Sequence, residues 1–249
     1  MLSVTAGKDA KDATTPARDV PDYSESLNKG VKGLKIGVPK EYFIDGLDPR
    51  IKDLTMKTIK NLETQGAEVT EVSLPHTEYA IAVYYIIQTA EVSSNLARYD
   101  GIRYGNPRST FGDEAKRRIM LGTYVLSAGY YDAFYKKGMQ VRTLIVDDFK
   151  KAFDPSADGV DVLITPASPT LPWKLGEKVN DPLKMYLSDI FTVHANLAGI
   201  PGLVVPAGFI NDLPVGVQIL GPHFSEEILF QVGQAIENME SVWKTTPKL

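Results

Sequence analysis

Hydrophobic and polar positions follow two periods along the chain, one typical of strands and one typical of helices. Residues 33–40 are a short β-branched run that ends at a proline, and residues 68–75 alternate between polar and apolar side chains. Both patterns predict strands. Between them lies a helical pattern with Asp48 as N-cap, Pro49 at the first helical position and Gly66 at its end. This strand–helix–strand order indicates half of a parallel α/β sheet.

The middle of the chain has helical periodicity. Residues 77–98 are apolar on almost every side, so this helix is expected to be largely buried. Residues 112–129 and 131–152 predict two further helices that join near Gly129. These helices are expected to form a layer against the sheet.

Strand patterns return after residue 159. Residues 160–170 predict a strand that ends in a proline-rich loop. Residues 181–221 predict a helix, a Gly-Pro break, a buried strand, a loop and a second strand. Residues 225–240 predict a closing amphipathic helix with Ser225 as its N-cap.

The distribution of linkers indicates a single domain. Residues 1–32 are polar, with scattered prolines, glycines and charges, and they predict a surface linker with a short helical stub at its start. Few other linkers separate the predicted elements. We therefore expect one α/β domain over residues 1–249, with a mixed sheet between helical layers.

Composition removes several classes of function. A net charge of −4 provides no general basic surface for nucleic acid. The absence of cysteine excludes disulfides, thiol nucleophiles and cysteine–metal sites. The three histidines are far apart in the sequence and lack zinc-binding spacing. No apolar run reaches the roughly 18 residues of a membrane-spanning helix, so we expect neither a metal site nor a membrane partner.

No serine of the chain stands in a recognisable nucleophile motif. The sequence lacks G-x-S-x-G, a Gly-rich phosphate loop, and a serine in familiar order with a histidine and an acid. Ser168 lies between two prolines in TPASPT and is interpreted as a structural loop residue, while Ser93 and Ser94 are interpreted as helix-surface or packing residues. Because a serine needs an adjacent base to act as a nucleophile, these patterns assign no catalytic residue.

Polar groups at three positions are candidates for binding chemistry. Arg117 and Arg118 precede an apolar run, either as part of a solvated basic turn or with one guanidinium turned inward to bind a carboxylate. Asp189 lies among apolar neighbours, as a partly exposed acid or as an anion that receives an ammonium group. Tyr84 and Tyr85 lie in an apolar helix, either as core residues or with a hydroxyl that needs a partner.

Together these groups suit a free amino acid. A zwitterion requires a cation for its α-carboxylate and an anion for its α-ammonium, between walls that exclude water. An inward-facing arginine together with Asp189 meets that requirement. Spacing alone leaves this hypothesis open beside the structural interpretation of each residue.

Several longer motifs resemble a known family. They are EVSSNLARYDGIRYG at 91–105, FGDEAKRRIMLG at 111–122, and NLAGIPGLVVPAG with LPVGVQILG within 196–221. The last pair is typical of the amidase signature family. The motifs GIRYG and MLGTYVLSAGYYDAFY narrow the resemblance to the A subunits of glutamyl-tRNA(Gln) amidotransferases. The resemblance covers nearly the whole chain, although the connection over 105–111 is shorter than is usual in the family.

The resemblance implies a place within the family domain and roles for individual residues. The chain is similar to the C-terminal half of an amidase-signature domain, and the Ser-Ser-Lys catalytic triad is expected in an N-terminal half that this sequence does not include. The implied roles are α-carboxylate binding by Arg118, α-amino binding by Asp189 and pocket lining by Tyr84, with glutamine as ligand. Arg118 over Arg117, and Tyr84 over Tyr85, are close choices. The isolated chain is expected to be inactive.

The resemblance also implies the reaction of the parent enzyme. The A subunit hydrolyses glutamine, and the ammonia passes to the B subunit, which converts Glu-tRNA(Gln) to Gln-tRNA(Gln) with ATP and magnesium. A small C subunit accompanies the other two, and tRNA is reached through the complex. The implied location is the cytoplasm, or an organelle matrix in a eukaryote, and this chain is expected to hold no cofactor. The alternatives are the C-terminal half of another amide hydrolase of the family, or a non-catalytic module that binds the partner subunits.

Overall fold

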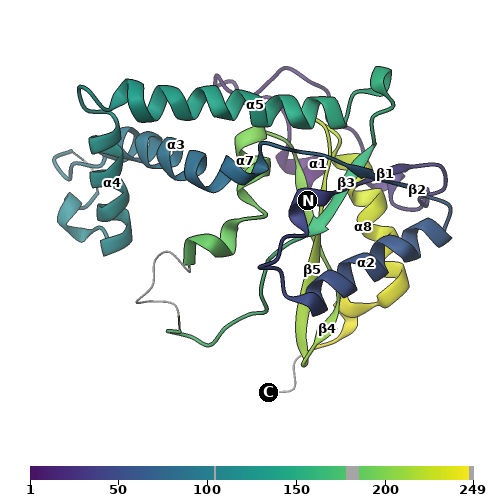
Figure 1. Cartoon of the computed structure of the whole chain (residues 1–249). Coiled ribbons are helices and arrows are strands. Elements are labelled where there is room, and N and C mark those ends of the chain that lie inside the picture. Colours follow the sequence, from purple (N-terminus) through teal and green to yellow (C-terminus); the bar gives the residue numbers. More distant parts are fainter. Residues whose placement is uncertain (104, 178–184, 247–249) are drawn as a thin grey trace.

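A five-stranded mixed sheet forms the centre of the computed structural model, which describes residues 1–103, 105–177 and 185–246 (Figure 1). The strands are β1 (Lys35–Pro39), β2 (Glu68–Val72), β3 (Val162–Pro166), β4 (Gly202–Ile210) and β5 (Leu213–Leu220). Their order is β2-β1-β3-β5-β4. Strand β1 is parallel to β2 and β3, while β5 is antiparallel to β3 and β4. The predicted α/β class with a mixed sheet is confirmed.

The first strand–helix–strand unit forms as the sequence predicts. Helix α2 (Pro49–Thr64) begins after Asp48, whose carboxylate accepts a hydrogen bond from the backbone nitrogen of Arg50 at 2.9 Å. Gly66 follows the helix with a φ of +96°, a left-handed conformation that glycine adopts without steric cost. The chain then enters β2 in parallel register with β1.

Helices cover both faces of the sheet (Figure 1). Helix α8 (Glu226–Glu240) packs on one face, and α3 (Ala80–Asn95), α5 (Lys137–Ala152) and α7 (Val193–Ala198) pack on the other, while α2 contributes Ile51 to the cluster of α3, α5 and α7, and Ile59 and Leu62 to the cluster of α8. Helix α4 (Asp113–Val125) packs against α3. Short helical segments in the described part of the chain include α1 (Leu2–Thr5), η1 (Tyr23–Ser26), η2 (Lys40–Tyr42), η3 (Thr77–Tyr79), η4 (Leu96–Arg98), η5 (Arg108–Thr110), η6 (Tyr131–Lys136), η7 (Pro155–Ala157), η8 (Leu187–Asp189) and η9 (Val242–Lys244).

The sheet separates two hydrophobic clusters. In β3, Val162 and Ile164 belong to the cluster that includes α8, whereas Leu163 between them belongs to the cluster that includes α3, α5 and α7. All three side chains are fully buried. This alternation follows from the two-residue period of a strand. The side of the sheet on which Leu163 lies therefore supports α3, the helix that carries Tyr84 and Tyr85.

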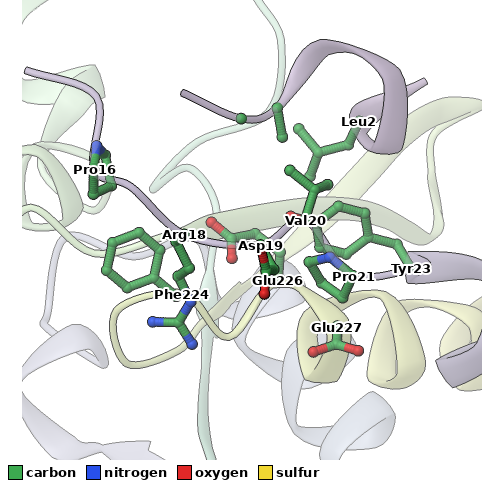
Figure 2. A pocket seen from close by; sticks show the side chains of 12 residues that line it. Leu2, Pro16, Arg18, Asp19, Val20, Pro21, Tyr23, Phe224, Glu226 and Glu227 are labelled. Atoms are coloured by element: carbon green, nitrogen blue, oxygen red, sulfur yellow. The ribbon is translucent and has the colours of Figure 1, made fainter. Parts of the chain in front are cut away.

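Residues 1–32 lie against α8 and the loop before it. The guanidinium of Arg18 lies over the Phe224 ring at 4.4 Å from the centroid, and the Tyr23 ring meets Phe230 edge-on at 5.6 Å. A cavity of ≈ 500 Å³ lies between the two segments, and Figure 2 shows Arg18, Tyr23 and Phe224 around it. These aromatic contacts attach residues 1–32 to α8 and the loop before it. The sequence predicts this segment as a surface linker with a short helical stub, and α1 is that stub.

Several predicted helices differ from the observed ones at their ends. The pattern over 131–152 begins as a π-helix, η6, before α5 starts. Of the helix predicted at the start of 181–221, residues 181–184 lie outside the described residues. Residues 185–186 are helical and lead into a 3₁₀ turn, η8, and the short α7 follows. Ser225 precedes α8 but does not cap it, because its hydroxyl donates to the carbonyl of Pro222 at 2.7 Å. Such local hydroxyl–carbonyl bonds compete with helix capping.

Helices α3 and α4 approach each other closely at Gly122. A Cβ at this position would lie 1.8 Å from the carbonyl oxygen of Thr89 and 2.8 Å from the Cβ of Ser93. Only glycine fits in this contact, since any larger residue would force the two helices apart. Gly122 lies about one turn after Arg118, so this contact fixes how far that arginine stands from α3.

Candidate functional site

Tyr85 on α3 connects the two charged groups that the sequence singled out. Its hydroxyl donates a hydrogen bond to Oδ2 of Asp189 at 3.1 Å. The guanidinium carbon of Arg118 lies over the same ring, 5.7 Å from its centroid, within the range of a cation–π contact. A cation from α4 and a carboxylate from η8 therefore meet at one tyrosine.

The guanidinium that faces this cluster is that of Arg118. The Arg118 side chain is 26% exposed, whereas that of Arg117 is 47% exposed. Nε of Arg118 donates to Oε1 of Glu114 at 2.9 Å, and Nη1 of Arg117 donates to Oε2 of the same carboxylate. Arg117 is thus the outer member of the pair. The role of Arg118 toward a ligand stays a prediction.

Tyr84 lies beside the cluster. Its ring meets Tyr85 edge-on, with 5.2 Å between centroids and 87° between planes. It also lines a cavity of ≈ 300 Å³ with Gln88, Arg142 and Asn196. Of the consecutive tyrosines, Tyr85 makes the contacts with the charged groups, and the pocket-lining role of Tyr84 stays a prediction.

Arg118 and Asp189 each have hydrogen-bonding positions left for a ligand. In the part of the chain that the structure describes, Asp189 accepts a hydrogen bond from Tyr85, and the ion-pair partner of Arg118 is Glu114. No ion pair joins Arg118 to Asp189 among those described residues. A carboxylate accepts several hydrogen bonds and a guanidinium offers five donors, so both groups can take a further partner.

The surroundings keep these groups in defined protonation states. Burial raises the pKa of the Tyr85 phenol, and the charge and hydrogen bond of Asp189 raise this pKa further. Tyr85 therefore remains a neutral donor at neutral pH. The hydrogen bond from Arg118 lowers the pKa of Glu114, although partial burial acts in the opposite direction. Burial disfavours the charge on Arg118, but the hydrogen bond and charge of Glu114 outweigh it, so the pKa of Arg118 is raised.

Two members of the cluster, Tyr186 and Glu114, were not among the sequence candidates. The Tyr186 hydroxyl donates to Oε1 of Glu114 at 3.0 Å, and its ring lies 4.2 Å from that of Tyr85. Helical spacing contains a signal for Glu114, because a residue four positions before Arg118 lies on the same face of a helix. Tyr186 makes its contacts with residues that are distant in the sequence, which no local pattern reports.

The serines considered as nucleophiles have local partners. Ser168 donates to the carbonyl of Thr170 at 3.2 Å, and Ser93 donates to the carbonyl of Ala90 at 2.8 Å. These bonds fit their interpretation as loop and helix residues. Over the described residues, no group of three or more His, Cys, Asp or Glu side chains is arranged to hold a metal ion. None of the helices in that part of the chain is long and apolar enough to cross a membrane.

Comparison with known proteins places the chain in a family. The family model described as Amidase matches residues 1–230. The chain belongs to the amidase signature family. Among curated relatives of this amidase chain, the A subunit of the glutamyl-tRNA(Gln) amidotransferase of Persephonella marina is 50% identical over 264 residues, covering 100% of this chain and 54% of the relative. The corresponding protein of Acidobacterium capsulatum is 54% identical over 256 residues, covering 96% of this chain and 53% of the relative.

Solved amidase structures share the fold. The crystal structure of the glutamyl-tRNA(Gln) amidotransferase A subunit from Thermotoga maritima matches with a TM-score of 0.76 at 42% identity, over 94% of this chain and 48% of that one. A bacterial aryl acylamidase of the amidase signature family matches with a TM-score of 0.69 at 24% identity, over 93% and 48% of the two chains. This amidase chain spans about half the length of the curated relatives that it matches.

Proposed function

We propose that this chain is part of the glutaminase subunit of a glutamyl-tRNA(Gln) amidotransferase and supplies the groups that bind glutamine. The observation that carries the proposal is the meeting of Arg118 and Asp189 at Tyr85. Relatives with the name of that subunit, at about half identity over the whole chain, support the choice within the family.

The charges fit the backbone groups of a free amino acid. The guanidinium of Arg118 would bind the α-carboxylate through paired N–H donors, the geometry that arginine offers to carboxylates. Asp189 would accept from the α-ammonium, while the neutral hydroxyl of Tyr85 donates to its Oδ2 and orients the carboxylate. A site that fixes both ends of the zwitterion leaves the side-chain amide as the reacting part of the substrate.

The catalytic groups of the proposed reaction are expected outside this sequence. In the parent enzyme a serine would attack the side-chain amide of glutamine, and an acyl-enzyme and ammonia would form. The B subunit would use the ammonia, with ATP and magnesium, to convert Glu-tRNA(Gln) to Gln-tRNA(Gln), and the C subunit would complete the complex. We place this reaction in the cytoplasm, or in an organelle matrix if the source is a eukaryote. The 249-residue chain alone is expected to bind glutamine without hydrolysing it.

Calorimetric titration of the 249-residue chain with glutamine analogues tests the proposal. N-acetyl-L-glutamine lacks the ammonium, and the α-amide of L-glutamine lacks the carboxylate. We expect each analogue to bind at least about tenfold more weakly than L-glutamine, because each leaves one charged group without its partner. Arg118→Ala and Asp189→Ala should each lower L-glutamine affinity similarly. Equal binding of all three compounds, or undiminished binding by both variants, would reject the proposed site.

An ammonia-release assay on the same chain tests the expected inactivity. No turnover of glutamine above the buffer control is expected, since none of the sequence motifs supplies a nucleophile with its base. Robust turnover would show that the chain contains its own catalytic groups. Release of ammonia from simple amides, but not from glutamine, would favour another amide hydrolase of the family.

A further inference from the structure

The carboxylate of Glu114 joins two segments of the candidate site. Its Oε1 accepts from Nε of Arg118 at 2.9 Å and from the hydroxyl of Tyr186 at 3.0 Å. Its Oε2 accepts from Nη1 of Arg117. One oxygen therefore ties α4 to the segment that leads into η8, which carries Asp189.

The bond to Nε restricts how Arg118 can meet a ligand. A guanidinium binds a carboxylate in a bidentate manner through one of two edges, either Nε with one Nη or the two Nη groups together. Glu114 occupies the Nε position, and no hydrogen bond among the described residues engages the terminal nitrogens of Arg118. The edge formed by the two Nη groups is consequently the one available for a ligand carboxylate.

The hydrogen bond between Glu114 and Tyr186 affects the position of Asp189. Tyr186 lies three residues before Asp189, and its ring is 4.2 Å from the ring of Tyr85, which donates to Asp189. Tyr186 is thus held at its hydroxyl by Glu114 and at its ring by Tyr85. Fixing this side chain fixes the turn on which Asp189 stands.

We propose that Glu114 is a positioning residue, which orients Arg118 for end-on binding of the α-carboxylate and, through Tyr186, sets the spacing between Arg118 and Asp189. This inference rests on the proposed glutamine site for its ligand, whereas the orientation of Arg118 is a property of the chain itself. It assigns Glu114 and Tyr186 to a role that involves no contact with the substrate.

Arginine Nε–H NMR signals test the orientation without any ligand. In the 249-residue chain, the Arg118 Nε–H should exchange slowly with water, because its proton is held by Glu114. Glu114→Ala should abolish this protection. Glu114→Gln should retain it, since the amide oxygen replaces Oε1, and Asp113→Ala, which removes an acid from the same first turn of α4, should leave it unchanged. An unchanged Arg118 signal in Glu114→Ala overturns the proposal.

Affinity measurements test the effect on the ligand. For Glu114→Ala we expect a loss of about tenfold or more for L-glutamine and a clearly smaller loss for 4-aminobutanamide, which keeps the ammonium for Asp189 but lacks the α-carboxylate for Arg118. Tyr186→Phe, which keeps the ring, should give a smaller loss, and Glu114→Gln should restore most of the affinity. Equal losses for both ligands would indicate general structural damage and contradict the positioning role. If the unmodified chain binds no glutamine, the proposed function fails, and the NMR result still decides the role of Glu114.

Discussion

The phenol of Tyr85 illustrates how the surroundings of one residue fix its chemistry. Its burial and the adjacent Asp189 raise its pKa above the usual value of about 10. The folded state thus holds the proton more tightly than the unfolded state. The stabilisation that results is fully present below about pH 10 and is lost as the pH rises above that value.

Alkaline spectrophotometric titration provides a direct measurement. The chain has 12 tyrosines, and the phenolate absorbance that develops between about pH 9 and 11 reports those with ordinary pKa values. We expect Tyr85→Phe to leave this absorbance change unaltered, because Tyr85 stays protonated over that range. Loss of one tyrosine equivalent from the transition near pH 10 would contradict the raised pKa.

The choice between neighbouring residues marks the limit of sequence reasoning at this scale. Successive residues of a helix point about 100° apart, so whether Tyr84 or Tyr85 faces Asp189 depends on how α3 is rotated in the fold. Tertiary packing sets that rotation. The resemblance narrowly favoured Tyr84 as a pocket-lining residue, which stays a prediction, and in the structure Tyr85 contacts the charged groups. For the arginine pair, the preference for Arg118 agrees with its lower exposure.

At the scale of elements, the contact between α3 and α4 is the feature on which Arg118 depends. We expect Gly122→Ala to destabilise the chain by about 1–3 kcal/mol, because the added methyl group would overlap the Thr89 carbonyl. The same variant should weaken glutamine binding, since α4 must move away from Tyr85. Chemical denaturation and calorimetric titration measure the two effects.

A second helical glycine provides the matched control. Gly138 in α5 also faces α3, but a Cβ there would lie 3.4 Å from Ile86, which is ordinary van der Waals contact. Gly138→Ala should therefore be neutral or stabilising by up to about 1 kcal/mol through its higher helix propensity. Similar destabilisation by both substitutions would mean that the close approach at Gly122 has no special role.

Most elements could be predicted from the sequence, because periodicity and capping are local signals. The helix after Asp48 and the strands around it are examples, and β3 lies within the predicted strand. The close approach at Gly122 has no local signal, since it depends on a carbonyl of another helix. Near Asp189 the sequence predicts one helix, whereas the described residues there include a 3₁₀ turn, η8, and the short α7, and no local signal marks this division.

At the scale of the whole molecule, β4 is an edge of the sheet in the described part of the chain. It contains Pro206, which cannot donate a ladder hydrogen bond and is typical of edge strands. Val204 on this strand is 53% exposed. An edge with an exposed apolar side chain invites pairing with another chain, so we expect the isolated chain to self-associate as its concentration rises.

Sedimentation velocity tests this expectation. Val204→Lys should shift the chain toward the monomer, because a charged side chain on an edge strand opposes pairing. Val4→Lys is the control, since Val4 in α1 is 87% exposed and lies outside the sheet. If both variants associate equally, the contact lies on another surface. If the unmodified chain is monomeric at every concentration, β4 does not pair with another chain.

The placement of Arg118 and Asp189 at one tyrosine has a stereochemical consequence. An α-carbon whose carboxylate and ammonium are both held has two directions left, one for hydrogen and one for the side chain. The mirror-image amino acid exchanges those two directions. Such a site therefore aims the side chain of only one enantiomer at a given point, and a third contact at that point, with the side-chain amide, would make the site select one hand.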